Sequence, residues 1–149
     1  METIGTVDSL LKRKGAVVWS VSPDATVFDA IQKMADKNVG ALLVMEGDVL
    51  IGIMTERDYT RKVALKGKVS KQTLVREILT GIIISAKPED TVEHCMRLMT
   101  ENRVRHLSVV DEGVVVGVVS IGDLVNWTIS QQSATISQLH SYITGGYPG

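Results

Sequence analysis

The sequence predicts a mixed α/β fold of the α+β type. Two β-α-β-β-α repeats are expected, related by pseudo-twofold symmetry and packed through their sheets, with a C-terminal helical extension. The first observation is an internal duplication: residues 23–59 and 88–124 align at a constant offset of 65 positions without a gap. The second is that each copy has apolar residues first at helical spacing and then in two short β-branched runs. Each copy is one supersecondary unit with an apolar face, so the two are expected to bury that face against each other.

The same order of elements is predicted in both copies. A short strand comes first, at 17–21 and 82–85, and an amphipathic helix follows. Thr26 and Thr91 are expected to cap these helices, because a hydroxyl oxygen can accept from an unpaired amide of the first turn. A buried strand, a tight turn of acidic residues and glycine, and an antiparallel return strand complete the sheet. A closing helix then begins at Thr55 and at Ser120.

Shorter similarities set the predicted boundaries. Residues 7–11 resemble residues 75–79 at an offset of 68, so each copy is expected to own a short leading helix. The predicted domains are a first repeat over residues 7–65 and a second repeat over residues 75–127. An exposed lysine-rich connector, 66–74, is expected between them, and a helical tail, 128–149, after them. The tail carries a weaker apolar stripe at helical spacing and is expected to be an interaction surface.

Composition excludes several classes of protein. With 149 residues, a net charge of -1 and a pI near 6.3, the chain has no overall field that would hold nucleic acid or an acidic membrane. The basic connector is expected to be solvated, since aromatic residues make up only 4% of the chain. The lone Cys95 excludes an internal disulfide. No charged leader or long apolar run is visible, which predicts a soluble, cytoplasmic protein.

Catalysis is not predicted. The sequence has no Walker loop, no carboxylate cluster for a metal, and no Ser-His-acid or Cys-His set with meaningful spacing. Cys95 occupies the position of Ala30 in the other copy, which favours a small buried side chain over a reactive thiol. No catalytic residue, metal ligand or metal is therefore expected.

A family resemblance rests on motifs that occur twice. Each copy opens with Pro-Asp/Glu-x-Thr-Val and closes with Gly, two apolar residues, Thr or Ser, two further residues and Asp, at 52–58 and 117–123. This ordered set, over about residues 7–127, resembles a pair of CBS domains (a Bateman module) of the stand-alone bacterial kind. The resemblance implies a non-catalytic regulatory module that binds AMP, ADP, ATP, NAD or S-adenosylmethionine in clefts between the copies. It also implies a homodimer that acts on an unknown protein target.

The closing motif supplies candidate ribose ligands. A carboxylate near a helix start can accept hydrogen bonds from both ribose hydroxyls, and a hydroxyl three residues earlier lies on the same helical face. The candidates are Thr55, Asp58, Ser120 and Asp123. For each of them alone, ordinary helix capping is the alternative explanation. Recurrence at equivalent positions of both copies favours ribose binding.

Adenine and phosphate contacts are predicted from the same pattern. By the family pattern, the adenine-binding residues are Ala16, Val39, Gly40, Ala41 and Val104, and residues 39–41 are expected to face Ser120 and Asp123. The small residues Gly40 and Ala41 leave room for a base, whereas Arg105 and His106 bring bulk and positive charge to the equivalent positions. Phosphate is therefore expected to bind Arg57, Arg105 and His106. Arg57 could instead be a solvated helix residue, and His106 a structural strand residue.

A second class of function remains open. The duplicated fold could serve as a structural or protein-interaction module with empty clefts. In that case Arg105 and His106 would only form salt bridges inside the fold.

Overall fold

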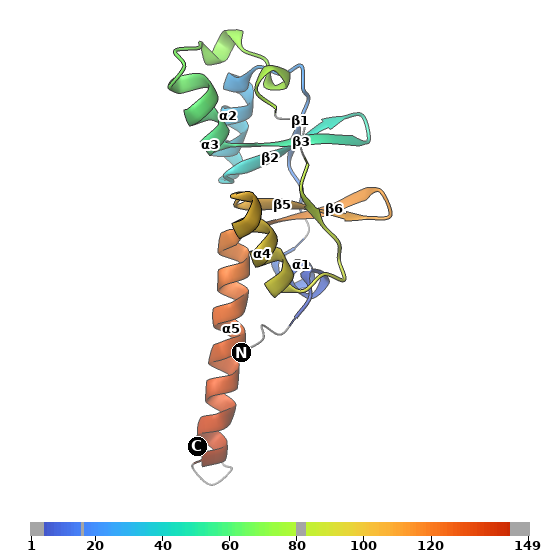
Figure 1. Ribbon diagram of the computed structural model, residues 1–149, viewed down its shortest axis with the longest axis vertical. Coiled ribbons are helices and arrows are strands. Elements are labelled where there is room, and N and C mark those ends of the chain that lie inside the picture. The colour runs from blue at the N-terminus through green and yellow to red at the C-terminus, as the bar shows by residue number, and fades with distance from the viewer. Residues whose placement is uncertain (1–4, 16, 80–82, 144–149) are drawn as a thin grey trace. The chain divides into compact units, whose positions relative to one another are not determined.

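The computed structural model describes residues 5–15, 17–79 and 83–143, and the side chains of its last helix through residue 132. The chain forms two compact units, which are described here one at a time. The first-repeat unit comprises Val17–Ser85, and the second-repeat unit comprises Met1–Ala16 and Ala86–Gly149. Two three-stranded sheets with accompanying helices confirm the predicted α/β class (Figure 1).

The first-repeat unit contains one sheet in the order β1-β2-β3. Strand β1 pairs parallel with β2, and β2 pairs antiparallel with β3. The helix α2 connects β1 to β2, and α3 follows β3. The bounds are β1 Ser20–Val21, α2 Val27–Lys37, β2 Ala41–Glu46, β3 Val49–Thr55 and α3 Glu56–Tyr59. A π-helical segment and two 3-10 turns complete the unit, at Thr60–Ala64, Ser70–Gln72 and Val75–Ile78.

The second-repeat unit repeats this order in its own sheet, β4-β5-β6. One helix, α1, comes from the N-terminal part of the chain. The bounds are α1 Val7–Lys14, β4 Ser85–Ala86, α4 Val92–Asn102, β5 His106–Asp111, β6 Val114–Ser120 and α5 Ile121–Ile143. The β-α-β-β-α order predicted for both copies is therefore confirmed.

The opening strands are shorter than predicted. Only two residues of the expected strand 17–21 pair with β2, namely Ser20 with Leu43 and Val21 with Val44. Val17 is 68% exposed and lies before the two paired residues of this edge strand. In the second copy the strand is Ser85–Ala86, and the predicted start at Ile82 lies outside the described residues.

The predicted helix caps are confirmed. The Thr26 hydroxyl oxygen accepts from the Asp29 amide at 3.1 Å, and the Thr91 hydroxyl oxygen accepts from the His94 amide at 3.0 Å. Each bond satisfies one of the amides that a helix start leaves without an intrahelical partner. The cap residue therefore fixes the start of α2 and of α4 at the same place in each repeat.

Equivalent residues fill the two cores. In the first-repeat unit the buried cluster consists of Val27, Ala30, Met34, Leu42, Val44, Met54, Val63, Val75 and Ile78. Its counterpart includes Cys95, which is fully buried where the first copy has Ala30. Burial raises the pKa of the Cys95 thiol to about 11, with a smaller contribution from the charge of Asp90. This agrees with the prediction of a core residue, because the reactive form of cysteine is the thiolate.

The leading segments pack differently from the prediction. The Val7 amide donates to Asp90 O, and the Val75 amide donates to Ala25 O, both at 2.9 Å. Helix α1 therefore packs on the second repeat, and Val75–Ile78 packs on the first. The sequence showed that the two segments are equivalent, but the expectation that each belongs to the copy following it is wrong. Each leading segment instead adds its side chains to the core of the other repeat.

The recurrent glycine of the return strand has a packing role in this arrangement. A Cβ atom at Gly117 would lie 2.8 Å from the nearest methyl carbon of Leu11, and one at Gly52 would lie 3.1 Å from that of Leu79. Ordinary carbon contacts are about 3.5–4.0 Å long. In each unit, the glycine therefore allows a leucine, Leu11 or Leu79, to pack closely against the return strand.

Two predicted connecting regions are more structured than expected. Thr73, near the end of the predicted connector 66–74, is buried, and its carbonyl accepts from the Val27 amide at 2.8 Å. The last part of that connector is therefore integrated into the first-repeat unit. The closing helix and the described part of the predicted tail, through Ile143, form one continuous helix, α5 (Figure 1). The predicted boundary at residue 128 falls inside this helix.

Candidate ligand-binding site

The junction between β6 and α5 positions Ser120 and Asp123. The Ser120 hydroxyl oxygen accepts from the Asp123 amide at 3.1 Å, and the Ser120 amide donates to Asp123 Oδ2 at 2.8 Å. These reciprocal bonds form a capping box, in which each residue satisfies an amide of the other. The carboxylate is thereby fixed at the first turn of α5, where the helix dipole favours a negative charge.

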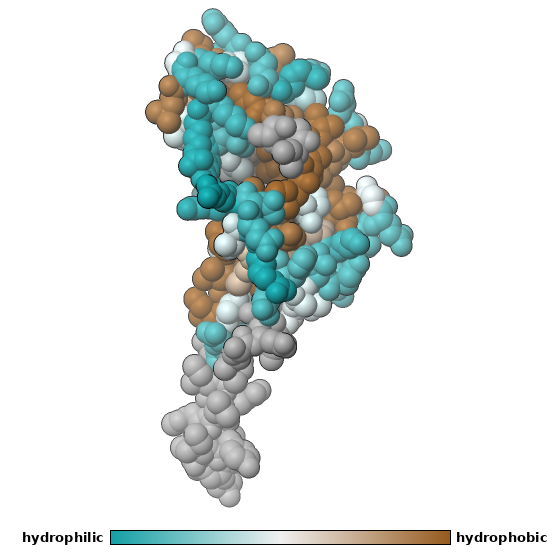
Figure 2. Space-filling model, in the orientation of Figure 1, coloured by the Kyte–Doolittle hydropathy of each residue, from teal (hydrophilic) through white to brown (hydrophobic). Residues whose placement is uncertain are grey.

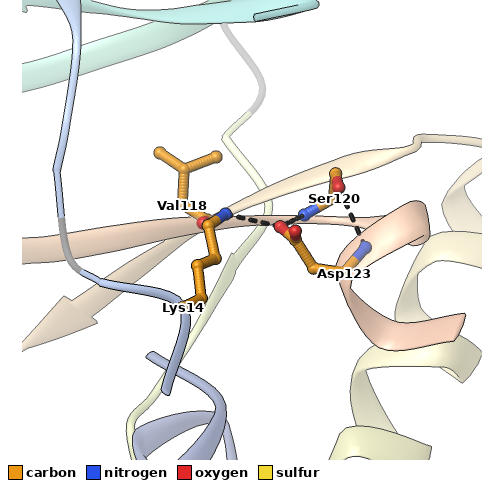
Figure 3. Close-up of polar contacts among 4 residues, drawn as sticks. All are labelled: Lys14, Val118, Ser120 and Asp123. Atoms are coloured by element: carbon orange, nitrogen blue, oxygen red, sulfur yellow. Dashed lines mark hydrogen bonds and ion pairs between the residues drawn. The ribbon is translucent and has the colours of Figure 1, made fainter. Parts of the chain in front are cut away.

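A lysine from the end of α1 reaches this carboxylate. Lys14 Nζ donates to Asp123 Oδ2 at 2.5 Å and to the carbonyl oxygen of Val118 at 2.8 Å. Figure 3 shows the Lys14 side chain extending to the Asp123 carboxylate beside the Ser120 amide. The Lys14 side chain is 35% exposed and that of Asp123 is 25% exposed. The pair is therefore partly buried but still in contact with solvent.

Asp123 is held in its ionised form. Burial alone would raise the pKa of the Asp123 carboxyl. The Lys14 hydrogen bond, the Ser120 amide and the Lys14 charge oppose that effect and hold the pKa below its ordinary value. The carboxylate is consequently a hydrogen-bond acceptor at neutral pH, which is the form that recognition of hydroxyl groups requires.

The first repeat has a similar junction between β3 and α3. Asp58 Oδ2 accepts from the Thr55 amide at 2.9 Å and from the Thr55 hydroxyl at 3.1 Å. Asp58 also has a lysine neighbour: Lys62 Nζ lies 3.5 Å from Oδ1 and donates to the carbonyl oxygen of Ile78 at 2.9 Å. Both candidate carboxylates are therefore accessible helix-start acids that are paired with a cation.

The predicted phosphate ligands of the second repeat lie beside its hydroxyl residue. His106 is the register partner of Ser120 across β5 and β6, and the Arg105 carbonyl accepts from the Ile121 amide at 2.9 Å. Arg105 is exposed and His106 is half-buried. The unit thus brings two basic residues to the strand end at which Ser120 and Asp123 stand.

The small residues of the first repeat have the equivalent placement. Ala41 is the register partner of Thr55, and the Gly40 carbonyl accepts from the Glu56 amide at 3.1 Å. Arg57, on α3, is exposed. Val39 and Val104 are half-buried at the ends of α2 and α4, where their amides donate to helix carbonyls. Ala16 lies outside the described residues. The prediction that residues 39–41 face Ser120 and Asp123 stays a prediction.

Sequence reasoning did not find the two lysines. For Lys62 a signal exists, because it follows Asp58 by four residues and such pairs are neighbours on a helix. For Lys14 no local pattern exists, since it lies 109 residues from Asp123 in sequence. Only the packing of α1 on the second repeat brings the two together.

The described residues contain neither a candidate metal-ligand cluster nor a helix that could span a membrane. Within residues 5–15, 17–79 and 83–143, no group of three or more His, Cys, Asp or Glu side chains could hold a metal ion. None of the helices in these ranges is both long and apolar enough to span a bilayer.

Comparison with known proteins decides the family. The sequence model of the CBS domain matches residues 14–65 and 75–130, one match for each repeat. The chain belongs to the CBS domain family. It is a tandem CBS domain pair, which is a regulatory module, so the predicted resemblance is confirmed.

Relatives of this CBS pair include a plant protein. The chain is 40% identical over 152 residues to the CBS domain-containing protein CBSX3, mitochondrial, of Arabidopsis thaliana. The match covers 95% of this chain and 73% of the relative. That relative is named for its CBS domains alone.

One solved structure supports the same assignment, and a second shares the fold. A protein with CBS domains from Burkholderia ambifaria MC40-6 is 46% identical, with a TM-score of 0.82, covering 86% of this chain and 96% of that one. The CBS domain pair of protein MJ0100 has the same fold at 22% identity, with a TM-score of 0.75, covering 86% of this chain and 98% of that one. Its structure is a complex with 5′-methylthioadenosine and S-adenosylmethionine.

Proposed function

We propose that this CBS pair is a non-catalytic sensor that binds an adenosine-containing nucleotide, such as AMP, ADP, ATP or NAD. The observation that supports the proposal most is Asp123: an ionised, partly exposed carboxylate at a helix start, with a cation and a hydroxyl residue beside it. A carboxylate that accepts from both ribose hydroxyls forms charge-assisted hydrogen bonds, each worth about 1.5–3 kcal/mol before desolvation is counted.

Under this proposal Asp123 and Asp58 each bind a ribose. Ser120 and Thr55 donate or accept a further bond, while Arg105, His106 and Arg57 pair with phosphate. Strand register pairs His106 with Ser120, and the Arg105 carbonyl accepts from the Ile121 amide at 2.9 Å. The adenine contacts proposed for residues 39–41 and for Val104 rest on the sequence pattern. The ligand acts as a signal only if its affinity differs between two states of the protein.

The proposal is tested by isothermal titration with AMP, ADP, ATP, NAD and S-adenosylmethionine. Asp123→Asn should weaken binding at its site by about 2 kcal/mol, roughly 30-fold, because the amide loses the charge that strengthens both bonds. Asp111→Asn is the matched control, since Asp111 is an exposed acid at the end of β5 in the same unit. Absence of heat with every nucleotide at millimolar concentration would refute the proposal.

One observation favours a second candidate function. Lys14 and Lys62 each pair with a candidate carboxylate inside the fold, so neither acid requires a ligand to balance its charge. Such pairing within the fold is compatible with a structural or protein-interaction module whose sites stay empty. The two functions differ in thermal unfolding: a nucleotide at 100 times its Kd stabilises a sensor by about 2.7 kcal/mol and leaves a module with empty sites unchanged.

We further propose that the protein is a cytoplasmic homodimer that acts on a protein target, without nucleic-acid or membrane partners. Support comes from three apolar side chains of α5 that are exposed at four-residue spacing, Ile121, Val125 and Ile129. Apolar surface is visible on the described part of this helix (Figure 2). Side chains at this spacing share one helix face, which a second copy could cover. Light scattering at several concentrations measures the oligomeric state.

A further inference from the structure

In the Lys14–Asp123 pair, one oxygen of the Asp123 carboxylate already accepts two hydrogen bonds. Asp123 Oδ2 accepts from the Ser120 amide at 2.8 Å and from Lys14 Nζ at 2.5 Å. A carboxylate oxygen has two lone-pair sites, so both sites of Oδ2 are occupied. A ribose diol that binds side-on needs both carboxylate oxygens. For a ribose that places one hydroxyl on each oxygen, one of the two present donors must therefore leave.

Lys14 is the donor that can leave. The Ser120 amide is part of the backbone, and it is fixed by the β6 strand and by the capping box. Lys14 reaches Oδ2 with the end of a flexible four-carbon side chain that is 35% exposed. Partly exposed ion pairs contribute little free energy, so releasing this one costs only a factor of a few in affinity.

The released ammonium stays close to the site. Lys14 is the last residue of α1, and the preceding residue anchors that helix end to α5. Arg13 donates to the Ser130 hydroxyl at 2.8 Å, and its guanidinium lies 5.5 Å from the centre of the Trp127 ring. A cation held beside the bound ligand lowers the free energy of an anionic ligand and does nothing comparable for a neutral one.

We propose that Lys14 is a specificity-determining residue, which exchanges the Asp123 carboxylate for a phosphate group of the ligand. This inference rests on the proposed function and restricts the expected ligands to phosphorylated ones. The Asp123 site should prefer phosphorylated adenosine ligands over neutral adenosine, and over adenosyl ligands that carry a positive sulfonium group. Binding of a neutral nucleoside separates Lys14 from the Asp123 carboxylate and offers the lysine no anionic group in exchange.

The first repeat has a different arrangement of lysine and carboxylate. Lys62 approaches the other carboxylate oxygen, Asp58 Oδ1, at the longer distance of 3.5 Å, and both bonds to Oδ2 come from Thr55. Release of Lys62 would therefore not free a lone-pair site on Asp58 Oδ2, whose two bonds come from the neighbouring Thr55. The preference for a phosphate is assigned to the Asp123 site.

The test is a comparison of AMP with adenosine by titration of the full chain. Lys14→Met keeps an unbranched apolar side chain, one heavy atom shorter, and removes the charge. AMP affinity should fall about 10-fold or more, while adenosine affinity stays constant or rises up to about 5-fold. Lys14→Arg should keep the AMP preference to within about 3-fold. Lys12→Met is the matched control, because Lys12 lies on the same helix and pairs with Asp8 instead.

The outcomes separate this inference from the proposed function. If the wild-type protein binds neither compound nor any other adenosyl ligand, the proposed function fails. If Lys14→Met binds AMP and adenosine with the wild-type ratio, the inference about Lys14 fails and the proposed function stands. Titration of the wild-type protein alone also decides: equal affinity for AMP and adenosine, or tighter binding of S-adenosylmethionine than of AMP, overturns the inference without any variant.

Discussion

Gly117→Ala tests the packing of α1 on the second repeat. The new Cβ would lie 2.8 Å and 2.9 Å from the two methyl carbons of Leu11, which is only 6% exposed. Relaxation to an ordinary contact requires Leu11 to retreat by about 0.7 Å or more. Overpacking of a core costs about 1–3 kcal/mol, and the loss of glycine's freedom in the unfolded chain returns about 0.4–1 kcal/mol. We therefore expect a net loss of about 1 kcal/mol in the free energy of unfolding.

The matched substitution is Gly52→Ala in the other repeat. Its Cβ would lie 3.1 Å from the nearest methyl carbon of Leu79, so a shift of a few tenths of an ångström is enough. Gly52→Ala should accordingly cost less than Gly117→Ala.

A double-mutant cycle measured by urea unfolding tests whether Leu11 is the side chain that residue 117 contacts. Leu11→Ala alone should cost about 2–5 kcal/mol, as for other buried leucines. In the Leu11→Ala background, Gly117→Ala should become neutral or slightly stabilising, since the clash is gone. Residues in contact show such coupling, whereas independent sites add. If Gly117→Ala costs the same with leucine or alanine at position 11, α1 does not pack on this strand and the reasoning is wrong.

Three further results are expected. Because the pKa of Asp123 is lower in the folded protein, its contribution to stability should be present above the unfolded value near 3.9 and lost as the pH falls through the folded pKa. The stability difference between wild type and Asp123→Asn, measured by thermal unfolding, should therefore shrink toward pH 3. A constant difference would contradict this. The Cys95 thiol, with its pKa raised to about 11, should react with a thiol reagent at pH 8 only after unfolding, so prompt labelling of the native protein would show that it is accessible. Ile129→Glu should convert the proposed dimer to a monomer in light scattering, and an unchanged mass would exclude this face of α5 as the contact.

Much of the fold was predictable because duplication reports the same structure twice. Thr26 and Thr91 recur at the start of equivalent helices, and both cap them. The recurrence also identified Cys95 as a core residue through its equivalence to Ala30. Local chemistry and internal comparison were enough for these features, since each depends on residues close together in the chain.

The exchange of leading segments could not be predicted in the same way. The similarity of residues 7–11 to 75–79 shows that both segments dock alike, but it does not show on which repeat. That choice depends on tertiary packing of Leu11 against Gly117 and of Leu79 against Gly52. The contact of Lys14 with Asp123 follows from this choice and was hidden for the same reason. The ribose role of Asp58 and Asp123 remains a prediction, because capping and ligand binding use the same carboxylate.

The central claim is that the Asp123 carboxylate binds the ribose hydroxyls of an adenosine nucleotide. The most direct measurement is titration of the wild-type protein and Asp123→Asn with AMP and with 2′,3′-dideoxy-AMP. Removing both hydroxyls should weaken binding to the wild-type protein roughly 30-fold or more, and should change the affinity of the Asp123→Asn site by much less. Equal affinity of the wild-type protein for the two ligands would contradict the claim.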